Sequence, residues 1–510
     1  MTPGHLRRDA ALQTVLWIAV VVVANHLASA IPIRIDATGD QRFTLSQAAH
    51  DAVAHLERTL VVTAYFTADL DAPYHEHEAA LRDTLDALAV AGAGRIDVQF
   101  VDPSTAERAE AAQRAGITPV TYTVRAWDRQ EARSVFMGVH VGYGDRQMAV
   151  PALLSIPKME VELVRAIRIL TVDPEDRRKV ALLQGHGEPN PADYPAQHPL
   201  YQLRARLGER YEVVQTVGDA PFDEDIAAVL TLAPTSPMPA ATLWHLDQFL
   251  MGGGALGFFV ASAQPDYQRG TTFEVRHGIG GFLGSYGLAL GREVVLDRVH
   301  NEKITLPAPG GRSVQVDSPL ALTTTHVERT AHAVRSLRSA TFPFAAPVVV
   351  ADPLPEGIQA EVWIRSGPES TARPGPIPLD PRLLVEPAAS EVAGPHVLAA
   401  VATGTFPSFF QGQPPPGVRA DEPLAKGRLG RLLVVGSGDA AANNVDFVLN
   451  SVEWLLEDPS LATIRARATG DGPMTPPPAE TAWRWKIAVV APQLLLGLAL
   501  AWRVRRRRLA

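Results

Sequence analysis

The chain has 510 residues, of which 46% are hydrophobic, and its formal net charge at pH 7 is −8. This length predicts two or three folded domains, and the hydrophobic content excludes global disorder. The negative net charge argues against nucleic acid as a partner, because nucleic-acid-binding proteins concentrate positive charge. Cysteine is absent, which excludes disulfides, thiolate metal ligands and cysteine nucleophiles.

The first predicted element is a membrane anchor over residues 1–34. Arg7 and Arg8 precede an apolar run from about residue 11 to residue 31, which is long enough to cross the hydrocarbon core of a bilayer. Basic residues beside a membrane helix stay in the cytoplasm, so we expect a cytoplasmic N-terminus. The alternative is a cleaved signal peptide, because residues 28–30 read Ala-Ser-Ala and resemble a cleavage site.

Residues 35–172 are predicted to form an α/β domain. Ser46 is the expected N-cap of its first helix, and a β-branched run at residues 60–66 predicts a buried strand. The order from this strand onward is β-α-β-α-β-β and a final helix, over residues 60–66, 76–91, 95–101, 104–115, 120–126, 136–143 and 157–170. This order resembles a thioredoxin-type fold in architecture only, because the chain has no thiol.

Residues 178–470 are predicted to form a second α/β domain, which is amidotransferase-like (flavodoxin-like). Strands that alternate with helices predict a parallel sheet with right-handed crossovers. The expected strands are 179–184, 211–217, 226–233, 255–260 and 429–435, and the expected helices are 199–208, 239–251 and 443–456. A proline-rich insertion with scattered short strands is expected at about 300–425.

The chain ends in a second predicted anchor. A linker over 471–482 leads into an apolar transmembrane helix over 483–503, and five arginines lie among the residues that follow Trp502. These arginines predict that the tail, residues 504–510, is cytoplasmic. We therefore expect a two-pass protein of the bacterial inner (cytoplasmic) membrane, with both termini in the cytoplasm and a large extracytoplasmic body.

The first candidate site lies in the loop after the first strand of the second domain. His186 and Glu188 follow this strand at its carboxyl end, where open α/β sheets bind ligands. They form either an acid/base or metal pair, or a tight structural turn. One histidine and one carboxylate fall short of the three protein ligands of a typical catalytic zinc, so we predict no metal.

Two further positions are candidates for ligand or partner contacts. Asp439 ends the turn Gly436-Ser437-Gly438-Asp439, which lacks the lysine of a phosphate-binding loop, so an Asp or Asn is expected to cap the following helix. Trp454 lies off the apolar stripe of the helix predicted at 443–456. It either covers the edge of the core or faces a partner.

No catalytic residue and no cofactor is predicted. Neither a nucleotide-binding loop nor a Gly-x-Ser-x-Gly motif occurs in the sequence. The end of the strand at 255–260, where class I glutamine amidotransferases place their cysteine nucleophile, is followed by Ala261 and Ser262.

Several stretches together resemble the gliding-motility-type (GldG-like) auxiliary subunits of ABC transporters. These stretches are RFTLS at 42–46, KVALLQGHGE at 179–188, LDQFLMGGGA at 246–255, LLVVGSGD at 432–439, NSVEWLLED at 450–458 and IRAR at 464–467. The resemblance implies a membrane-anchored subunit with an amidotransferase-like or intraflagellar-transport-like domain that lacks catalytic residues. Its implied partners are a separate ATPase and permease, and its implied role is in gliding motility or cell-surface export, without nucleotide binding of its own.

The alternative comes from a different class of protein. It is a membrane-tethered extracytoplasmic hydrolase or carbohydrate-binding protein that uses the His186/Glu188 loop. The two hypotheses differ in what they require of this loop, since a hydrolase needs the two side chains to reach a substrate.

Overall fold

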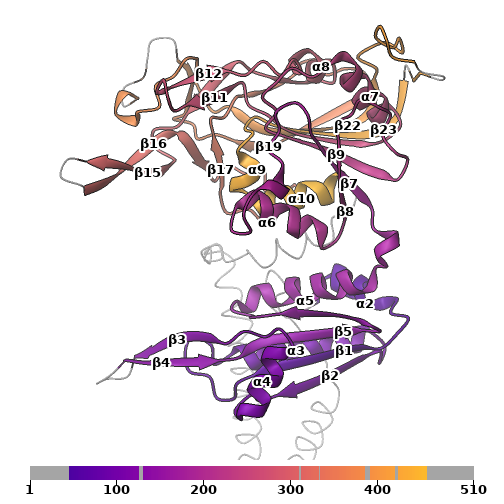
Figure 1. Cartoon of the computed structure of the whole chain (residues 1–510), viewed down its shortest axis with the longest axis vertical. Coiled ribbons are helices and arrows are strands. Elements are labelled where there is room, and N and C mark those ends of the chain that lie inside the picture. Colours follow the sequence, from indigo (N-terminus) through magenta and orange to yellow (C-terminus); the bar gives the residue numbers. More distant parts are fainter. Residues whose placement is uncertain are drawn as a thin grey trace, which may run out of the picture. The chain divides into compact units, whose positions relative to one another are not determined.

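The computed structural model describes residues 45–456, apart from 126–129, 309–311, 332, 385–386, 388–390, 420–422 and 425. The predicted anchors, the linker before the second anchor and the basic tail lie outside the described residues. Among the helices that are described, none combines the length and the apolar character that a membrane crossing needs. The chain divides into two compact units between Leu163 and Val164, inside helix α5 (Ile156–Thr171; Figure 1).

The first unit contains a four-stranded sheet of order β2-β1-β5-β6. The elements of this part of the chain are α2 (Gln47–Ala54), β1 (Leu60–Phe66), α3 (His77–Ala91), β2 (Ile96–Val101), α4 (Ala106–Arg114), β3 (Val120–Arg125), β4 (Gln130–Val135), β5 (Met137–Tyr143), β6 (Arg146–Val150) and α5 (Ile156–Thr171). Strands β1 and β2 are parallel, whereas β5 is antiparallel to both β1 and β6. The expected α/β architecture is confirmed, and the thioredoxin-type resemblance stays a prediction.

Local sequence signals account for most of the first unit. The Ser46 hydroxyl oxygen accepts a hydrogen bond from the Ala49 N–H at 3.1 Å, which confirms the predicted N-cap of α2. Every second residue of β1 is fully buried, as expected for a strand with one face on the core. Strand β4 was missed, and it forms a separate hairpin with β3. Its sequence, QEARSV, has no apolar alternation that could have indicated a strand.

The second unit is built on a seven-stranded sheet of order β19-β22-β23-β10-β9-β7-β8. These strands are β7 (Lys179–Leu183), β8 (Glu212–Thr216), β9 (Ile226–Leu232), β10 (Ala255–Phe259), β19 (Ile358–Arg365), β22 (Val397–Pro407) and β23 (Lys426–Val435). Strands β8, β7, β9, β10 and β23 are parallel and have the flavodoxin-type order, in which the first strand lies between the second and the third.

The expectation of a wholly parallel sheet is wrong at one edge. Strand β22 is antiparallel to β23, and β19 is antiparallel to β22. Both strands come from the region predicted as a proline-rich insertion, so part of that region completes the main sheet. The prolines of this region predict loops. The pairing of β22 with β23, by contrast, joins segments that no local sequence pattern connects.

Small sheets and a long hairpin make up most of the rest of the segment between β10 and β23. Their elements are β11 (Ala263–Asp266), β12 (Thr271–Glu274), β13 (Leu288–Leu290), β14 (Glu293–Leu296), β15 (Asn301–Ala308), β16 (Arg312–Thr324), β17 (Ala340–Pro343), β18 (Val348–Val350), β20 (Thr371–Pro374) and β21 (Val392–Ala393). Short 3-10 turns lie at η1 (Pro174–Asp176), η2 (Pro191–Asp193) and η3 (Pro381–Leu383).

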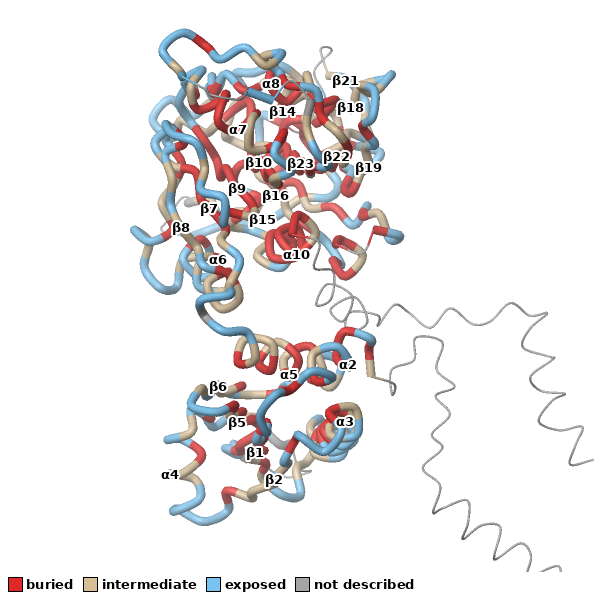
Figure 2. The backbone as a smooth tube through the Cα atoms, turned by 90° about the vertical axis from the view of Figure 1, so that its right-hand side faces the viewer, coloured by how far each residue is buried: buried red, intermediate tan, exposed pale blue. Residues whose placement is uncertain are grey.

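Helices cover both faces of the main sheet (Figure 1). On one face lie α6 (Pro199–Gly208), α9 (Ala440–Asn443) and α10 (Val445–Leu455), and on the other lie α7 (Ala240–Met251) and α8 (Gly280–Ser285). Strand β7 shows why both faces are needed. Val180 and Leu182 are buried in the core under α6 and α10, whereas Ala181 and Leu183 are buried in the core under α7. Figure 2 shows these buried strands at the centre of the unit.

The turn after β23 has no room for a side chain at Gly436. The Gly436 N–H donates to the Leu398 carbonyl at 2.8 Å, and the Ala346 N–H donates to the Gly436 carbonyl at 2.6 Å. A Cβ atom at this position would lie 1.9 Å from the Ala346 carbonyl oxygen, which belongs to the backbone between β17 and β18 and can move only with that segment. The motif glycine therefore serves close approach of two backbones.

We predict that Gly436→Ala lowers the free energy of unfolding by roughly 3 kcal/mol, because it overpacks a fixed backbone contact. Gly281→Ala is the matched control, since a Cβ atom at this helical position meets nothing within 4 Å. The control should leave the protein unchanged or slightly more stable. Urea denaturation of the purified chain, followed by circular dichroism, measures both. Equal stability of the two variants would contradict the prediction.

Candidate functional site

The loop with His186 and Glu188 lies between the carboxyl ends of β7 and β9. This is the point where the strand order reverses, and it is the usual ligand position in sheets of this type. The sequence therefore located the loop correctly. Its two glycines, Gly185 and Gly187, have φ angles of 98° and 81°, which L side chains rarely adopt.

The two candidate side chains contact each other inside the protein. One Glu188 carboxylate oxygen accepts the His186 N–H at 2.6 Å, and the other lies 3.3 Å from His186 Nδ1. Their side chains are only 5% and 0% exposed. The other ring nitrogen, Nε2, lies 3.5 Å from the Thr242 hydroxyl oxygen on α7. The pair is thus enclosed by the protein's own groups.

The same loop is tied to the segment after β9. The His186 carbonyl accepts hydrogen bonds from the N–H groups of Thr235 and Ser236, at 2.9 and 2.8 Å. A Cβ atom on Gly187 would lie 1.9 Å from the Thr235 hydroxyl oxygen, so the two segments are in close contact. Within the described residues, no group of three or more His, Cys, Asp or Glu could hold a metal ion. The geometry is that of a structural turn that joins two strand ends.

Asp439 does not make the expected helix cap. It occupies the N-cap position of the short helix α9, but its side chain accepts no cap hydrogen bond. Its backbone φ and ψ of −74° and −10° are already helical, whereas a capping residue needs an extended backbone to turn its oxygen toward the first amide groups. Neighbouring atoms desolvate its carboxyl and raise its pKa, although the residue as a whole is exposed.

The helix predicted at 443–456 is interrupted at its start. Asn444 separates α9 from α10, and its side chain bonds to backbone groups of Thr341 and Ala440 rather than capping α10. The side-chain oxygen accepts the Thr341 N–H at 2.9 Å, and the side-chain amide donates to the Thr341 carbonyl at 2.7 Å. Asn444 therefore fixes β17 against the helical segment.

Trp454 covers an edge of the core. It is half-buried, and its ring meets the ring of buried Trp363 edge to face, with centroids 5.0 Å apart. The Arg431 guanidinium carbon lies 5.4 Å from the Trp454 ring centroid, and the same side chain donates to the Trp454 carbonyl at 2.6 Å. These contacts join α10 to β19 and β23. Trp454 thus contacts the edge of the core, and the expectation that it faces a partner stays a prediction.

A buried carboxylate on α7 was missed by sequence reasoning. Asp247 is fully buried and accepts four hydrogen bonds, which is about the full capacity of a carboxylate. The donors are Tyr286 Oη at 2.6 Å, the Phe409 N–H at 2.7 Å, Ser408 Oγ at 2.8 Å and Gln248 Nε2 at 2.9 Å. The residue lies in the stretch LDQFLMGGGA, but three of its four partners are far away in sequence and gave no signal.

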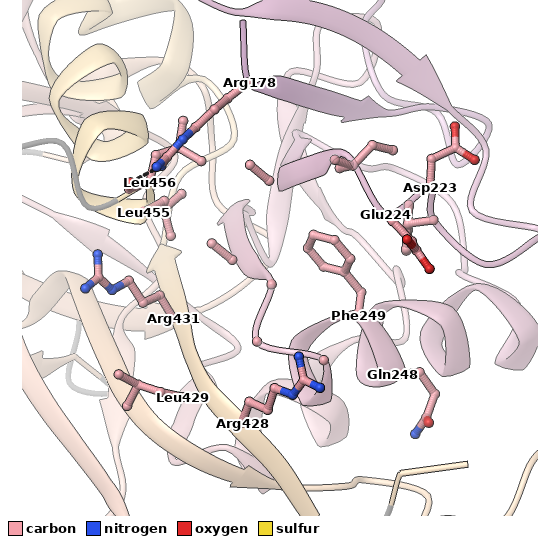
Figure 3. Close-up of a pocket in the computed structure, with 17 residues that line it drawn as sticks. Arg178, Asp223, Glu224, Gln248, Phe249, Arg428, Leu429, Arg431, Leu455 and Leu456 are labelled. Carbon is pink, nitrogen blue, oxygen red and sulfur yellow. Dashed lines mark hydrogen bonds between the residues drawn. The ribbon is translucent and has the colours of Figure 1, made fainter. Parts of the chain in front are cut away.

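A cavity of about 720 Å³ lies at the opposite, amino-terminal edge of the main sheet. Its lining comes from segments near the starts of β7, β9, β10 and β23, from the end of α7 and from the end of α10. We call it the amino-edge cavity. Figure 3 shows its lining, with Phe249 pointing into it between acidic residues on one side and arginines on the other.

Two arginines of this lining hold the end of α10. The Arg178 guanidinium donates to the Leu456 carbonyl, and Arg431 donates to the Trp454 carbonyl (Figure 3). Cations at a helix C-terminus satisfy its free carbonyls and interact favourably with the helix dipole, each by about 0.3–1 kcal/mol. Arg178 immediately precedes β7, so the chain enters and leaves this sheet at adjacent points.

Comparison with known proteins follows the same division of the chain. Residues 177–456 match a protein family described as "ABC-type uncharacterized transport system", and residues 39–142 match a family described only as a domain of unknown function. No curated protein matches the chain. The expected resemblance to auxiliary components of ABC transporters is confirmed by the first of these matches.

Two solved structures are similar to parts of the chain. The mmIFT52 N-terminal domain aligns with 54% of this chain and 97% of its own, at 14% identity and a TM-score of 0.32. A putative ThuA-like protein from Bacteroides uniformis aligns with 56% of this chain and 94% of its own, at 14% identity and a TM-score of 0.28. These TM-scores are too low to support an argument from either structure.

We predict that Glu188→Ala lowers the free energy of unfolding by about 1–3 kcal/mol, because it leaves the buried His186 N–H without its acceptor. Glu188→Gln should cost less, since its amide oxygen can still accept that hydrogen bond. Glu175→Ala, at an exposed acidic residue, is the control and should stay within about 0.5 kcal/mol of the unchanged chain. Urea denaturation measures all three, and equal curves for Glu188→Ala and Glu175→Ala would rule out a structural role.

The second prediction of this site concerns Tyr286 at high pH. Burial, then the charge of Asp247 and the hydrogen bond to it, raise the pKa of Tyr286 far above its usual range. The folded chain therefore holds this proton where the unfolded chain releases it, and its stabilising effect is full below about pH 10 and declines as the pH rises above that value.

Tyr286→Phe should remove this contribution to the loss of stability above about pH 10. An alkaline absorbance titration counts the tyrosines that ionise only when the protein unfolds. The unchanged chain should have one more such tyrosine than the Tyr286→Phe variant. A tyrosinate signal from Tyr286 in the folded chain, at the pH where exposed tyrosines titrate, would show that the buried contact is not formed.

Proposed function

Because the chain belongs to the ABC-type uncharacterized transport system family, we propose that it is a non-catalytic auxiliary subunit that works beside a separate ATPase and permease. The match over residues 177–456 is the observation that carries this proposal, since it covers more than half of the chain. The proposed contribution of the chain is binding and organisation of the transporter, with ATP hydrolysis located in the ATPase.

The side chains at the carboxyl edge of the sheet support a non-catalytic role. His186 and Glu188 are enclosed and bonded within their own loop. The hydroxyl of Ser262, which follows the strand end where a nucleophile would lie, donates to the Glu293 carbonyl at 3.3 Å, and that of Ser437 donates to the Pro343 carbonyl at 2.6 Å. The hydrolase alternative receives no support from these contacts, because it needs groups that can reach a substrate.

We further propose that the chain is anchored at both ends in the bacterial inner membrane, with its body outside the cytoplasm. The sequence of the two termini motivates this proposal. Each predicted anchor combines an apolar run with neighbouring arginines, and these two patterns carry the proposal.

Two narrower interpretations rest on less. The strand order β2-β1-β5-β6, with one parallel and two antiparallel pairings, supports the thioredoxin-type interpretation of the first unit. A role in gliding motility or cell-surface export rests on the resemblance of the quoted sequence stretches. Both are proposals about the kind of auxiliary subunit, and the proposed function does not depend on them.

The test is purification of the full-length chain, in mild detergent, from cells that also produce the ATPase and permease of its transport system. We expect the three proteins to elute together and the chain alone to hydrolyse no ATP. The Glu188→Gln variant is a useful control, because it alters the loop that a hydrolase would use. Elution of the chain without either partner, or ATP or ester hydrolysis by the pure chain that this variant loses, would contradict the proposal.

A further inference from the structure

The amino-edge cavity has walls of opposite charge and an apolar floor. Arg428 at the start of β23 forms one wall, and Asp223 and Glu224 before β9 form the other (Figure 3). All three residues are exposed, and within the described part of the chain Arg428 and Glu224 form no ion pair. Unpaired charges of both signs around one cavity match a ligand that also carries both signs.

The floor of the cavity is suited to an apolar side chain. The rings of Phe222 and Phe249 meet edge to face, with centroids 5.2 Å apart, and both are half-buried. Leu429 is 63% exposed, which is unusual for a strand residue of this size in such a position. The volume of about 720 Å³ lies within the range of pockets that enclose a ligand.

One wall of the cavity already holds a peptide backbone. The Gln248 side-chain oxygen accepts the Leu424 N–H at 2.7 Å, and its amide nitrogen donates to the Leu424 carbonyl at 3.0 Å. This paired contact reads a main-chain N–H and C=O together, as a neighbouring strand does. The Gln248 side chain at this wall is therefore already bonded to a main-chain segment of the protein itself.

We propose that the amino-edge cavity binds a peptide segment of a partner subunit of the transport system. The segment presents an acidic side chain to Arg428, a basic side chain to Asp223 and Glu224, and an apolar side chain to the floor. The choice of a subunit as the source rests on the proposed function, and on the position of the cavity beside the point where the chain enters and leaves the sheet.

The chain has no cysteine, so a cysteine introduced by mutation is the only thiol of this chain that can be labelled. Leu429→Cys places it in the cavity lining, and Val299→Cys is the matched control outside the lining, because Leu429 and Val299 are 63% and 62% exposed. N-ethylmaleimide is reacted with each full-length variant in open membrane fragments that contain the ATPase and permease. The same reaction is run in fragments that lack these partners, and with the purified chain.

We expect labelling at position 429 to be about tenfold slower in fragments with the partners than in the other two samples. A tenfold reduction corresponds to a cavity that is unoccupied in about one molecule in ten. Labelling at position 299 should be the same in all three. Adding Arg428→Glu should restore fast labelling at position 429, because it reverses one wall. Arg276→Glu should not restore fast labelling, because the Arg276 side chain is 83% exposed and lies outside the lining.

Two outcomes would overturn the proposal. Equal labelling at position 429 in all samples would show that nothing covers the cavity. Protection that persists without the partners would show that the occupant is not a subunit segment. Co-purification of the three proteins together with either outcome leaves the auxiliary function in place and removes only the cavity assignment, whereas failure of co-purification counts against the function itself.

Discussion

The second unit depends on one strand that pairs in two directions. Strand β23 is parallel to β10 on one side and antiparallel to β22 on the other, so it joins a flavodoxin-type sheet to a segment that runs against it. Its first residues supply Arg428 and Arg431 to the amino-edge cavity, and its last residue leads into the crowded turn at Gly436. Helix α10 then packs back on the sheet, where Arg431 holds its end. The cavity at one edge of the sheet and the turn at the other are thus both positioned by this strand.

The sequence predicted the parts of the fold that depend on neighbours along the chain. The apolar run of β7, the N-cap at Ser46 and the turn with His186 and Glu188 all have local signals, and each lies where it was expected. The antiparallel strands β19 and β22 had only weak signals, because their pairing depends on residues in other segments. Three of the four partners of Asp247 are 39, 161 and 162 residues away, and the cavity is assembled from at least five segments. Such contacts are products of the topology, which a pattern of residue types does not encode.

The distribution of polar groups separates structural from binding roles. At the carboxyl edge, His186, Glu188 and Ser437 are buried and bonded to the protein, as is Asp247 on α7. Buried polar groups of this kind fix one arrangement of the core, because each unpaired alternative is costly. At the amino edge, by contrast, charged side chains are exposed around a hollow. The second unit thus encloses its polar groups at the edge where sheets of this type bind ligands, and exposes charged groups at the opposite edge.

The hydrogen bond between Arg178 and Leu456 also has a mechanical meaning. It bridges the first and last segments of the sheet unit, next to the parallel strands rather than across them. A pulling force applied to the two ends of this unit would load that bridge and its immediate neighbours first, and would leave the interior strand pairs unstressed. Tension between the two ends of this unit would therefore meet the Arg178–Leu456 bridge before it reached the strands of the sheet.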